Sequence, residues 1–119
     1  MSDSEEGFLA ACLLSELMFG QAKSVVIGGV PLALVRTDEG VFAIKDRCSH
    51  ADVPLSEGEV DGCTIECWLH GSQFDVRTGR PMTLPATAVV PVFPVRITGD
   101  GADSIIEIST TPMLNTPAP

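Results

Sequence analysis

Cys48-Ser49-His50 and Cys67-Trp68-Leu69-His70 are two ligand-rich segments of this 119-residue chain, separated by the sixteen residues from 51 to 66. Together they contain both histidines and two of the four cysteines of the sequence. Each segment pairs a thiol with an imidazole, as C-x-H in the first and C-x2-H in the second. The pattern predicts a metal site held by two separate loops, because each loop supplies one sulfur and one nitrogen ligand.

Ligand type alone leaves zinc and iron–sulfur chemistry open, and the order of the ligands separates them. Thiolate suits both zinc and iron–sulfur clusters, and imidazole suits zinc, copper and iron. Structural zinc sites usually take Cys from C-x2-4-C pairs and His from H-x3-5-H pairs. Here Cys48 and Cys67 can bind one iron while His50 and His70 bind a second. We therefore expect a [2Fe–2S] cluster with mixed sulfur and nitrogen ligation, and an electron carrier built around it.

These residues resemble the two cluster loops of Rieske proteins. The resemblance continues through Gly71-Ser72-Gln73-Phe74-Asp75, Arg77-Thr78-Gly79 and Leu84-Pro85-Ala86, and it covers roughly residues 8 to 109. Within that family the chain looks most like the small ferredoxins that serve bacterial aromatic-ring-hydroxylating dioxygenases. The resemblance implies one [2Fe–2S] cluster, held by Cys48, His50, Cys67 and His70, and it implies electron transfer without catalysis by this chain itself.

The same resemblance implies two partners. A flavin-containing or iron–sulfur reductase would oxidise NAD(P)H and reduce this chain, and a terminal Rieske non-haem iron oxygenase would accept the electron. Two alternatives stay open. One is a Rieske-like small subunit of another redox enzyme, such as nitrite reductase, and the other is a zinc-stabilised interaction module. The aromatic substrate cannot be inferred, because its choice resides in the oxygenase.

A comparison with the respiratory Rieske proteins predicts the potential of the cluster. In that form two further cysteines link the loops by a disulfide, and Val53 and Leu69 occupy their positions here. Ser72 matches a serine that points its hydroxyl at a cluster sulfur, whereas Phe74 replaces the tyrosine that does the same. Hydrogen bonds to sulfur stabilise the reduced state. We therefore expect a potential near the low end of the Rieske range of about −150 to +300 mV.

Three apolar residues are further candidates for positions around the cluster. Trp68 lies between two ligands, where it either shields the cluster from water or presents a docking surface. The resemblance places Pro85 in a third loop that packs over the cluster, although a proline there would equally end a strand. Val53 is a candidate for an apolar rim.

Composition restricts the remaining function classes. The formal net charge is −9, from 7 Lys and Arg against 16 Asp and Glu, and no basic patch exists for nucleic acid. Among the acidic residues, Asp46, Asp52 and Glu57 are candidates for steering a basic partner. The N-terminus lacks the basic and apolar regions of a signal peptide, and the sequence has no run of about eighteen apolar residues. We expect a monomer in the cytoplasm, without a membrane span.

The two remaining cysteines, Cys12 and Cys63, are predicted to be thiols that fill gaps in the core, since a reducing cytosol disfavours disulfides. A ligand role for Cys63 would leave one histidine without a function. The pattern therefore excludes Cys63 from the cluster.

Alternating apolar residues and frequent turn signals predict an all-β fold. The Gly28-Gly29 turn joins a hairpin that continues into a third strand, which gives a meander. Strands are expected at 8–12, 23–27, 32–36, 41–45, 59–60, 63–67, 73–77, 92–97 and 104–108, and the Asp61-Gly62 turn is expected to join 59–60 to 63–67 in a hairpin. The family resemblance implies a single Rieske domain over 1–119. It comprises an antiparallel base sandwich or barrel at about 1–45 and 81–109, an inserted cluster-binding subdomain at about 46–80, and a flexible tail at 110–119.

Overall fold

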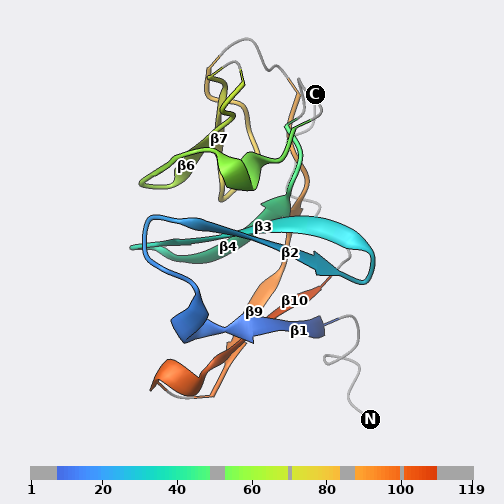
Figure 1. Ribbon diagram of the computed structural model, residues 1–119, viewed down its shortest axis with the longest axis vertical. Helices are drawn as coiled ribbons and strands as arrows, with labels where there is room; N and C mark the ends of the chain where they lie inside the picture. Colours follow the sequence, from blue (N-terminus) through green and yellow to red (C-terminus); the bar gives the residue numbers. More distant parts are fainter. Residues whose placement is uncertain (1–7, 49–52, 70, 84–87, 100, 110–119) are drawn as a thin grey trace.

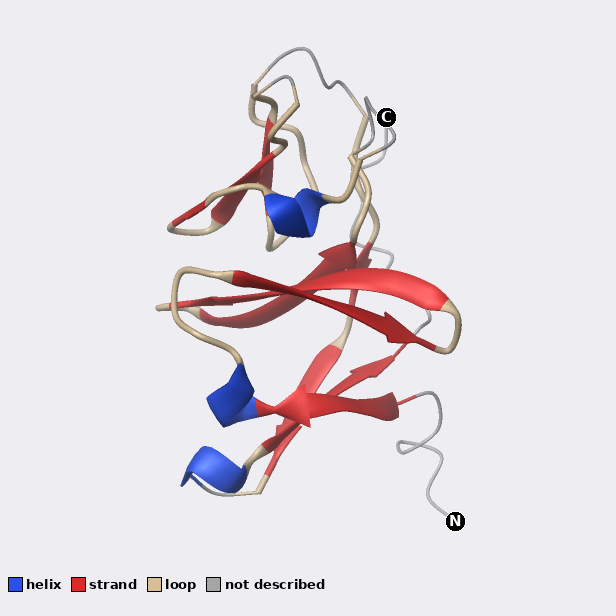
Figure 2. Ribbon diagram, viewed as in Figure 1, coloured by secondary structure: helices blue, strands red, loops and turns tan. Residues whose placement is uncertain are grey.

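The computed structural model describes residues 8–48, 53–69, 71–83, 88–99 and 101–109. In these ranges the chain forms ten strands and three short 3-10 helices (Figures 1 and 2). Every strand pairing within the three sheets is antiparallel. The prediction of an all-β fold is confirmed. None of the described segments forms a helix with the length and apolar character needed to cross a membrane.

The largest sheet has four strands in the order β2-β3-β4-β8. Its strands are β2 (Ala22–Ile27), β3 (Val30–Thr37), β4 (Gly40–Lys45) and β8 (Val92–Phe93). Gly28 and Gly29 turn β2 into β3 with φ angles of 58° and 84°, a conformation that glycine adopts without steric cost. The predicted meander through β2, β3 and β4 is therefore confirmed.

A second sheet has three strands in the order β1-β10-β9. Its strands are β1 (Phe8–Leu13), β9 (Val95–Thr98) and β10 (Ile105–Ser109), and the 3-10 helices η2 (Leu14–Glu16) and η4 (Gly101–Asp103) lie beside it. Leu32 and Leu34 of β3 are fully buried in one cluster with Ile106 and Ile108 of β10. The cluster contains residues of both sheets, and burying each of these side chains contributes about 1.5–3 kcal/mol to folding. The cluster therefore holds the two sheets together.

The expectation of one strand over residues 92–97 is wrong. The segment belongs to two sheets: β8 pairs with β4, and β9 pairs with β10. Pro94 lies between them and has no N–H group for a ladder, while its carbonyl oxygen accepts a hydrogen bond from the Ser109 N–H at 3.1 Å. The proline therefore marks the point where the chain leaves one sheet for the other.

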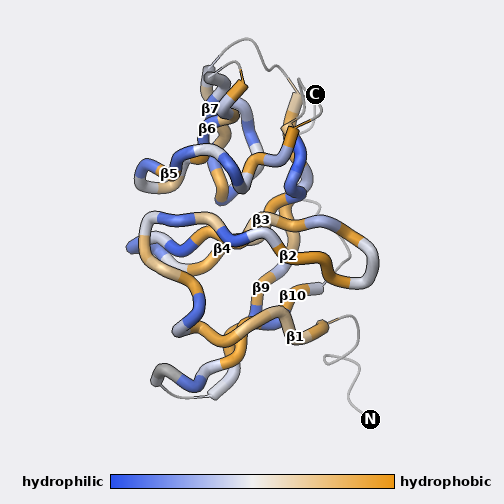
Figure 3. Tube along the Cα trace, viewed as in Figure 1, coloured by the Kyte–Doolittle hydropathy of each residue, from blue (hydrophilic) through white to orange (hydrophobic). Residues whose placement is uncertain are grey.

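The third sheet, β5-β6-β7, lies at the opposite end of the molecule from β1, β9 and β10 (Figure 1). Its strands are β5 (Val60–Asp61), β6 (Thr64–Glu66) and β7 (Gln73–Asp75), and the 3-10 helix η3 (Leu55–Glu57) precedes them. Figure 3 shows hydrophilic and hydrophobic residues mixed along this end of the chain. The division of the chain into base and cluster-binding subdomains stays a prediction.

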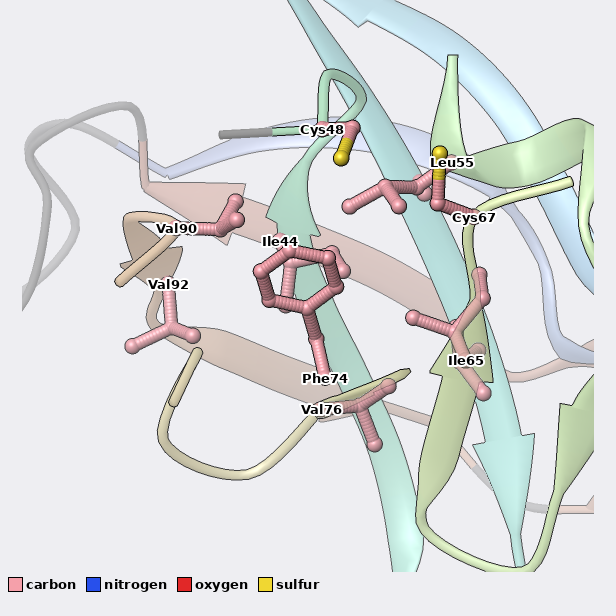
Figure 4. Packing of buried hydrophobic residues seen from close by; sticks show 11 residues of the cluster. Ile44, Cys48, Leu55, Ile65, Cys67, Phe74, Val76, Val90 and Val92 are labelled. Carbon is pink, nitrogen blue, oxygen red and sulfur yellow. The ribbon is translucent and has the colours of Figure 1, made fainter. Parts of the chain in front are cut away.

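A second buried cluster connects this third sheet to the four-stranded sheet (Figure 4). Val35 and Ile44 come from β3 and β4, and Ile65 and Phe74 come from β6 and β7; all four are fully buried. Cys48, Leu55 and Cys67 belong to the same cluster. The core therefore extends directly to the two cysteines of the ligand-rich segments.

Candidate metal centre

Cys48 and Cys67 lie together at one end of the second buried cluster. Their residues are 4% and 0% exposed, and Figure 4 draws both sulfur atoms at the same end of the cluster, beside Leu55. No disulfide joins any of the four cysteines, all of which lie in the described ranges. Two buried thiols from separate loops thus meet in one region, as a shared metal site requires.

Each ligand-rich loop is closed by a backbone hydrogen bond of the same kind, from the N–H of its cysteine to the carbonyl five residues later. The Cys48 N–H donates to the Val53 carbonyl at 3.0 Å, and the Cys67 N–H donates to the Ser72 carbonyl at 2.7 Å. In each case the acceptor lies five residues beyond the cysteine. Each closed loop includes one histidine position of the sequence, but His50 and His70 lie outside the described residues.

The other predicted site residues differ in exposure. Ser72 is fully buried, and Val53 is half-buried against the cluster that contains the cysteines. Trp68 is 51% exposed and follows the buried Cys67, so about half of the residue's surface is available to a partner. Pro85 lies outside the described residues.

The prediction that Asp46 is a surface steering group is wrong. Asp46 is only 7% exposed, and its two carboxylate oxygens accept hydrogen bonds from the N–H and the hydroxyl of Ser56, both at 2.7 Å. Glu57 is exposed, as a steering residue requires, and Asp52 lies outside the described residues. Sequence reasoning missed the buried role of Asp46 because an aspartate after a strand looks like an ordinary turn residue.

Cys12 and Cys63 are half-buried, and each packs against a different core cluster. The Cys63 sulfur lies 3.6 Å from the Thr37 hydroxyl, within hydrogen-bonding distance. The prediction that these cysteines are thiols filling core gaps is confirmed. Burial is the main cause that raises the pKa of Cys12 above its ordinary value of 9.0.

An ion-pair network fixes the end of β7 against the β3–β4 turn. Arg77 donates to both carboxylate oxygens of Asp75, at 3.0 and 2.9 Å, and its guanidinium lies 3.1 Å from Glu39. The side-chain hydrogen bond from Arg77 is the main cause that lowers the pKa of Asp75 below its ordinary value of 3.8. Glu39 and Arg77 are far apart in sequence, so the network links the third sheet to the four-stranded sheet.

The lowered pKa predicts how acid affects the protein. Because the folded state binds the Asp75 proton less readily than the unfolded state, the network stabilises the fold fully above about pH 4, and that contribution is lost as the pH falls through the lowered pKa. Asp75→Asn should cost about 1–3 kcal/mol at pH 7, and the difference from wild type should shrink below pH 4. Urea unfolding at several pH values measures this. The exposed Asp61→Asn variant is the control, and an equal loss in both variants would contradict the prediction.

The donor set fits the sulfur-ligated half of an iron–sulfur cluster. Cys48 and Cys67 supply soft ligands in a largely apolar environment, where they are protected from water. The imidazole half depends on His50 and His70, which are assigned from their positions in the sequence.

Comparison with known proteins matches residues 7–94 to the Rieske [2Fe-2S] domain. Ferredoxin CarAc of Metapseudomonas resinovorans is 38% identical over 91 residues, which cover 76% of this chain and 85% of that protein. The anthranilate 1,2-dioxygenase ferredoxin subunit of Burkholderia cepacia is 48% identical over 73 residues, covering 60% of this chain and 67% of that protein. Both relatives are ferredoxins, and the second is named as a subunit of a dioxygenase.

Solved structures agree with the sequence relatives. The complex of oxygenase and ferredoxin in carbazole 1,9a-dioxygenase contains a similar chain, with a TM-score of 0.81 and 32% identity over 92% of this chain and 98% of that chain. Structures assigned to nitrite reductase small subunits have TM-scores of 0.70 and 0.76 at 22% and 24% identity. At that identity the similarity shows the fold alone.

Proposed function

Because this chain belongs to the Rieske [2Fe–2S] domain family, we propose that it is the ferredoxin component of an aromatic-ring-hydroxylating dioxygenase system. It carries single electrons from an NAD(P)H-dependent reductase to a terminal oxygenase and does not itself hydroxylate the substrate. The observation that supports this most strongly is the pair of buried cysteines in two similarly closed loops, next to an exposed tryptophan.

Cys48 and Cys67 would hold one iron on the buried side, and His50 and His70 would hold the other. When bound, a [2Fe–2S] cluster supplies reversible uptake of one electron. The protein keeps the two thiols away from water and fixes their loops through the Val53 and Ser72 carbonyls. The fully buried Ser72 is the candidate for a hydroxyl donor to a cluster sulfur, and Pro85 for a residue that covers the cluster. One cluster per chain follows from a single ligand set.

The proposed partners follow from the relatives. A ferredoxin is seen with its oxygenase in the carbazole 1,9a-dioxygenase complex, and a terminal Rieske non-haem iron oxygenase would bind the cluster end of this chain in a related way. The proposed electron donor is a flavin-containing or iron–sulfur reductase. We place the protein in the cytoplasm as a monomer, consistent with reducing conditions for its thiols.

Stopped-flow kinetics test the function directly. Protein reduced by dithionite is mixed with an oxidised ring-hydroxylating oxygenase, and oxidation of the ferredoxin is followed by its visible absorbance. Rapid transfer of one electron per chain is expected. Failure to reduce any oxygenase, combined with tight incorporation into a nitrite reductase, would favour the alternative redox subunit.

Replacing Trp68 by alanine should weaken docking. The half-exposed Trp68 lies beside a proposed cluster ligand, and a tryptophan that acts as a hot spot of an interface contributes about 2 kcal/mol or more, or about 30-fold in the dissociation constant. Leu9→Ala, on β1 at the other end of the molecule and 47% exposed, is the control for Trp68→Ala. A Trp68→Ala protein that keeps its cluster and binds as tightly as wild type would rule out this docking surface.

Raising the salt concentration from about 10 to 500 mM should lower the association rate more than it changes the dissociation rate, because charge acts mainly on the encounter of the two proteins.

A further inference from the structure

Asp46 is a buried carboxylate two residues before Cys48. It immediately follows β4, and its N–H donates to the Pro31 carbonyl at 3.0 Å, so the backbone here is fixed to the start of β3. Both carboxylate oxygens are used by Ser56, one by its N–H and one by its hydroxyl. Burying a carboxylate is costly unless its oxygens are satisfied, and here a single residue ten positions later satisfies both.

This contact closes the base of the first ligand loop. Ser56 lies in η3, next to Leu55, and Leu55 is fully buried in the cluster that contains Cys48 and Cys67. Within the span from 46 to 56, the Cys48 N–H also bonds to the Val53 carbonyl. The Asp46 side chain therefore fixes the segment that presents Cys48 relative to the core beneath both thiols.

The carboxylate of Asp46 is buried, whereas the charged side chains of Lys45 and Arg47 on either side of it lie at the surface. Lys45 and Arg47 line a surface hollow of about 310 Å³ together with Cys48, whereas Asp46 is directed to Ser56, as alternation along an extended chain requires. In the described ranges no ion pair involves Asp46. A buried charge is screened much less by water than an exposed one, so it acts strongly on a nearby redox centre.

We propose that Asp46 is a positioning residue for the Cys48 loop and that its buried negative charge lowers the reduction potential of the cluster. The proposal rests on the proposed function, in which Cys48 is a cluster ligand. Electron uptake makes the cluster more negative, and a buried carboxylate near one of its ligands opposes that change. Asp46 thus favours electron donation to an acceptor.

Two substitutions separate charge from geometry. Asp46→Asn removes the charge but can still accept from the Ser56 N–H and donate to the Ser56 oxygen. It should raise the ratio of reduced to oxidised cluster about tenfold at a fixed solution potential, which is about 59 mV for one electron. Ser56→Ala keeps the charge and removes one hydrogen bond. It should not raise the potential, and its iron should be lost faster to a chelator.

Glu57→Gln is the matched control, because it removes one negative charge at an exposed position next to Ser56. Water and salt screen a charge at that position, so the ratio of reduced to oxidised cluster at a fixed solution potential should change less than about twofold. Potentials are measured by spectroelectrochemistry, with iron content and the EPR spectrum of each reduced protein.

Three results would overturn the proposal: a potential of Asp46→Asn that matches that of Glu57→Gln, a rise in the potential of Ser56→Ala as large as in Asp46→Asn, or loss of iron from Ser56→Ala to a chelator no faster than from the wild type. If the wild-type protein lacks a Rieske EPR signal, the proposed function fails instead. The two failures are therefore distinguishable.

Discussion

Cys67→Ser is expected to yield a colourless protein without bound iron. Cys67 is fully buried next to Cys48 and proposed to bind the same iron, and a serine hydroxyl is a much harder ligand than a thiolate. Loss of one of four ligands should remove nearly all the cluster from the purified protein. Iron and sulfide content and the visible spectrum measure this loss.

Cys63→Ser is the matched control for that experiment. Cys63 lies four residues before Cys67, and a serine there can still bond to the Thr37 hydroxyl that the Cys63 sulfur now approaches. Its iron and sulfide content should equal that of the wild type. A Cys67→Ser protein with a full cluster, or a Cys63→Ser protein without one, would contradict the ligand assignment.

Gly79→Ala is expected to destabilise the fold through a steric clash as well as backbone strain. A Cβ at Gly79 would overlap the Val90 carbonyl oxygen and lie 3.3 Å from the Val92 side chain. The Val90 N–H donates to the Gly79 carbonyl at 2.8 Å, so the two backbones are held in contact. Gly79 also has φ of +80°, which costs an alanine about 1–2 kcal/mol.

Gly29→Ala separates the clash from the backbone strain. Gly29 has a similar φ of +84°, but a Cβ there would meet no atom within 4 Å. Gly29→Ala should therefore cost about 1–2 kcal/mol, and Gly79→Ala at least about 2 kcal/mol more. Denaturant unfolding measures both losses. Equal losses of unfolding free energy in the two variants would show that the backbone near Val90 moves to accommodate the added methyl group.

Local patterns predicted the strands that depend on neighbouring residues. The Gly28-Gly29 turn and the alternation on either side of it are sufficient to place β2 and β3, because a hairpin is formed by adjacent segments. The cysteine and histidine spacing likewise predicted the family, since the ligand order is written in the sequence. Both signals are local or depend on residue type alone.

The features that could not be predicted depend on contacts between distant segments. The change of sheet at Pro94 depends on where β4 and β10 lie, and the burial of Asp46 depends on Ser56 in η3. Neither the change of sheet at Pro94 nor the burial of Asp46 can be read from the residues next to them in the sequence. The Arg77–Glu39 ion pair joins residues 38 positions apart, and nothing in the sequence around either residue indicates its partner.

The proposed function requires this chain to hold one [2Fe–2S] cluster with two thiolate and two imidazole ligands. EPR of the dithionite-reduced protein, with electron–nuclear double resonance at nitrogen, tests this ligand set most directly. We expect two irons and two sulfides per chain, a Rieske-type signal and couplings from two imidazole nitrogens. A colourless protein with stoichiometric zinc, or a cluster signal without nitrogen coupling, would contradict the proposed ligand set.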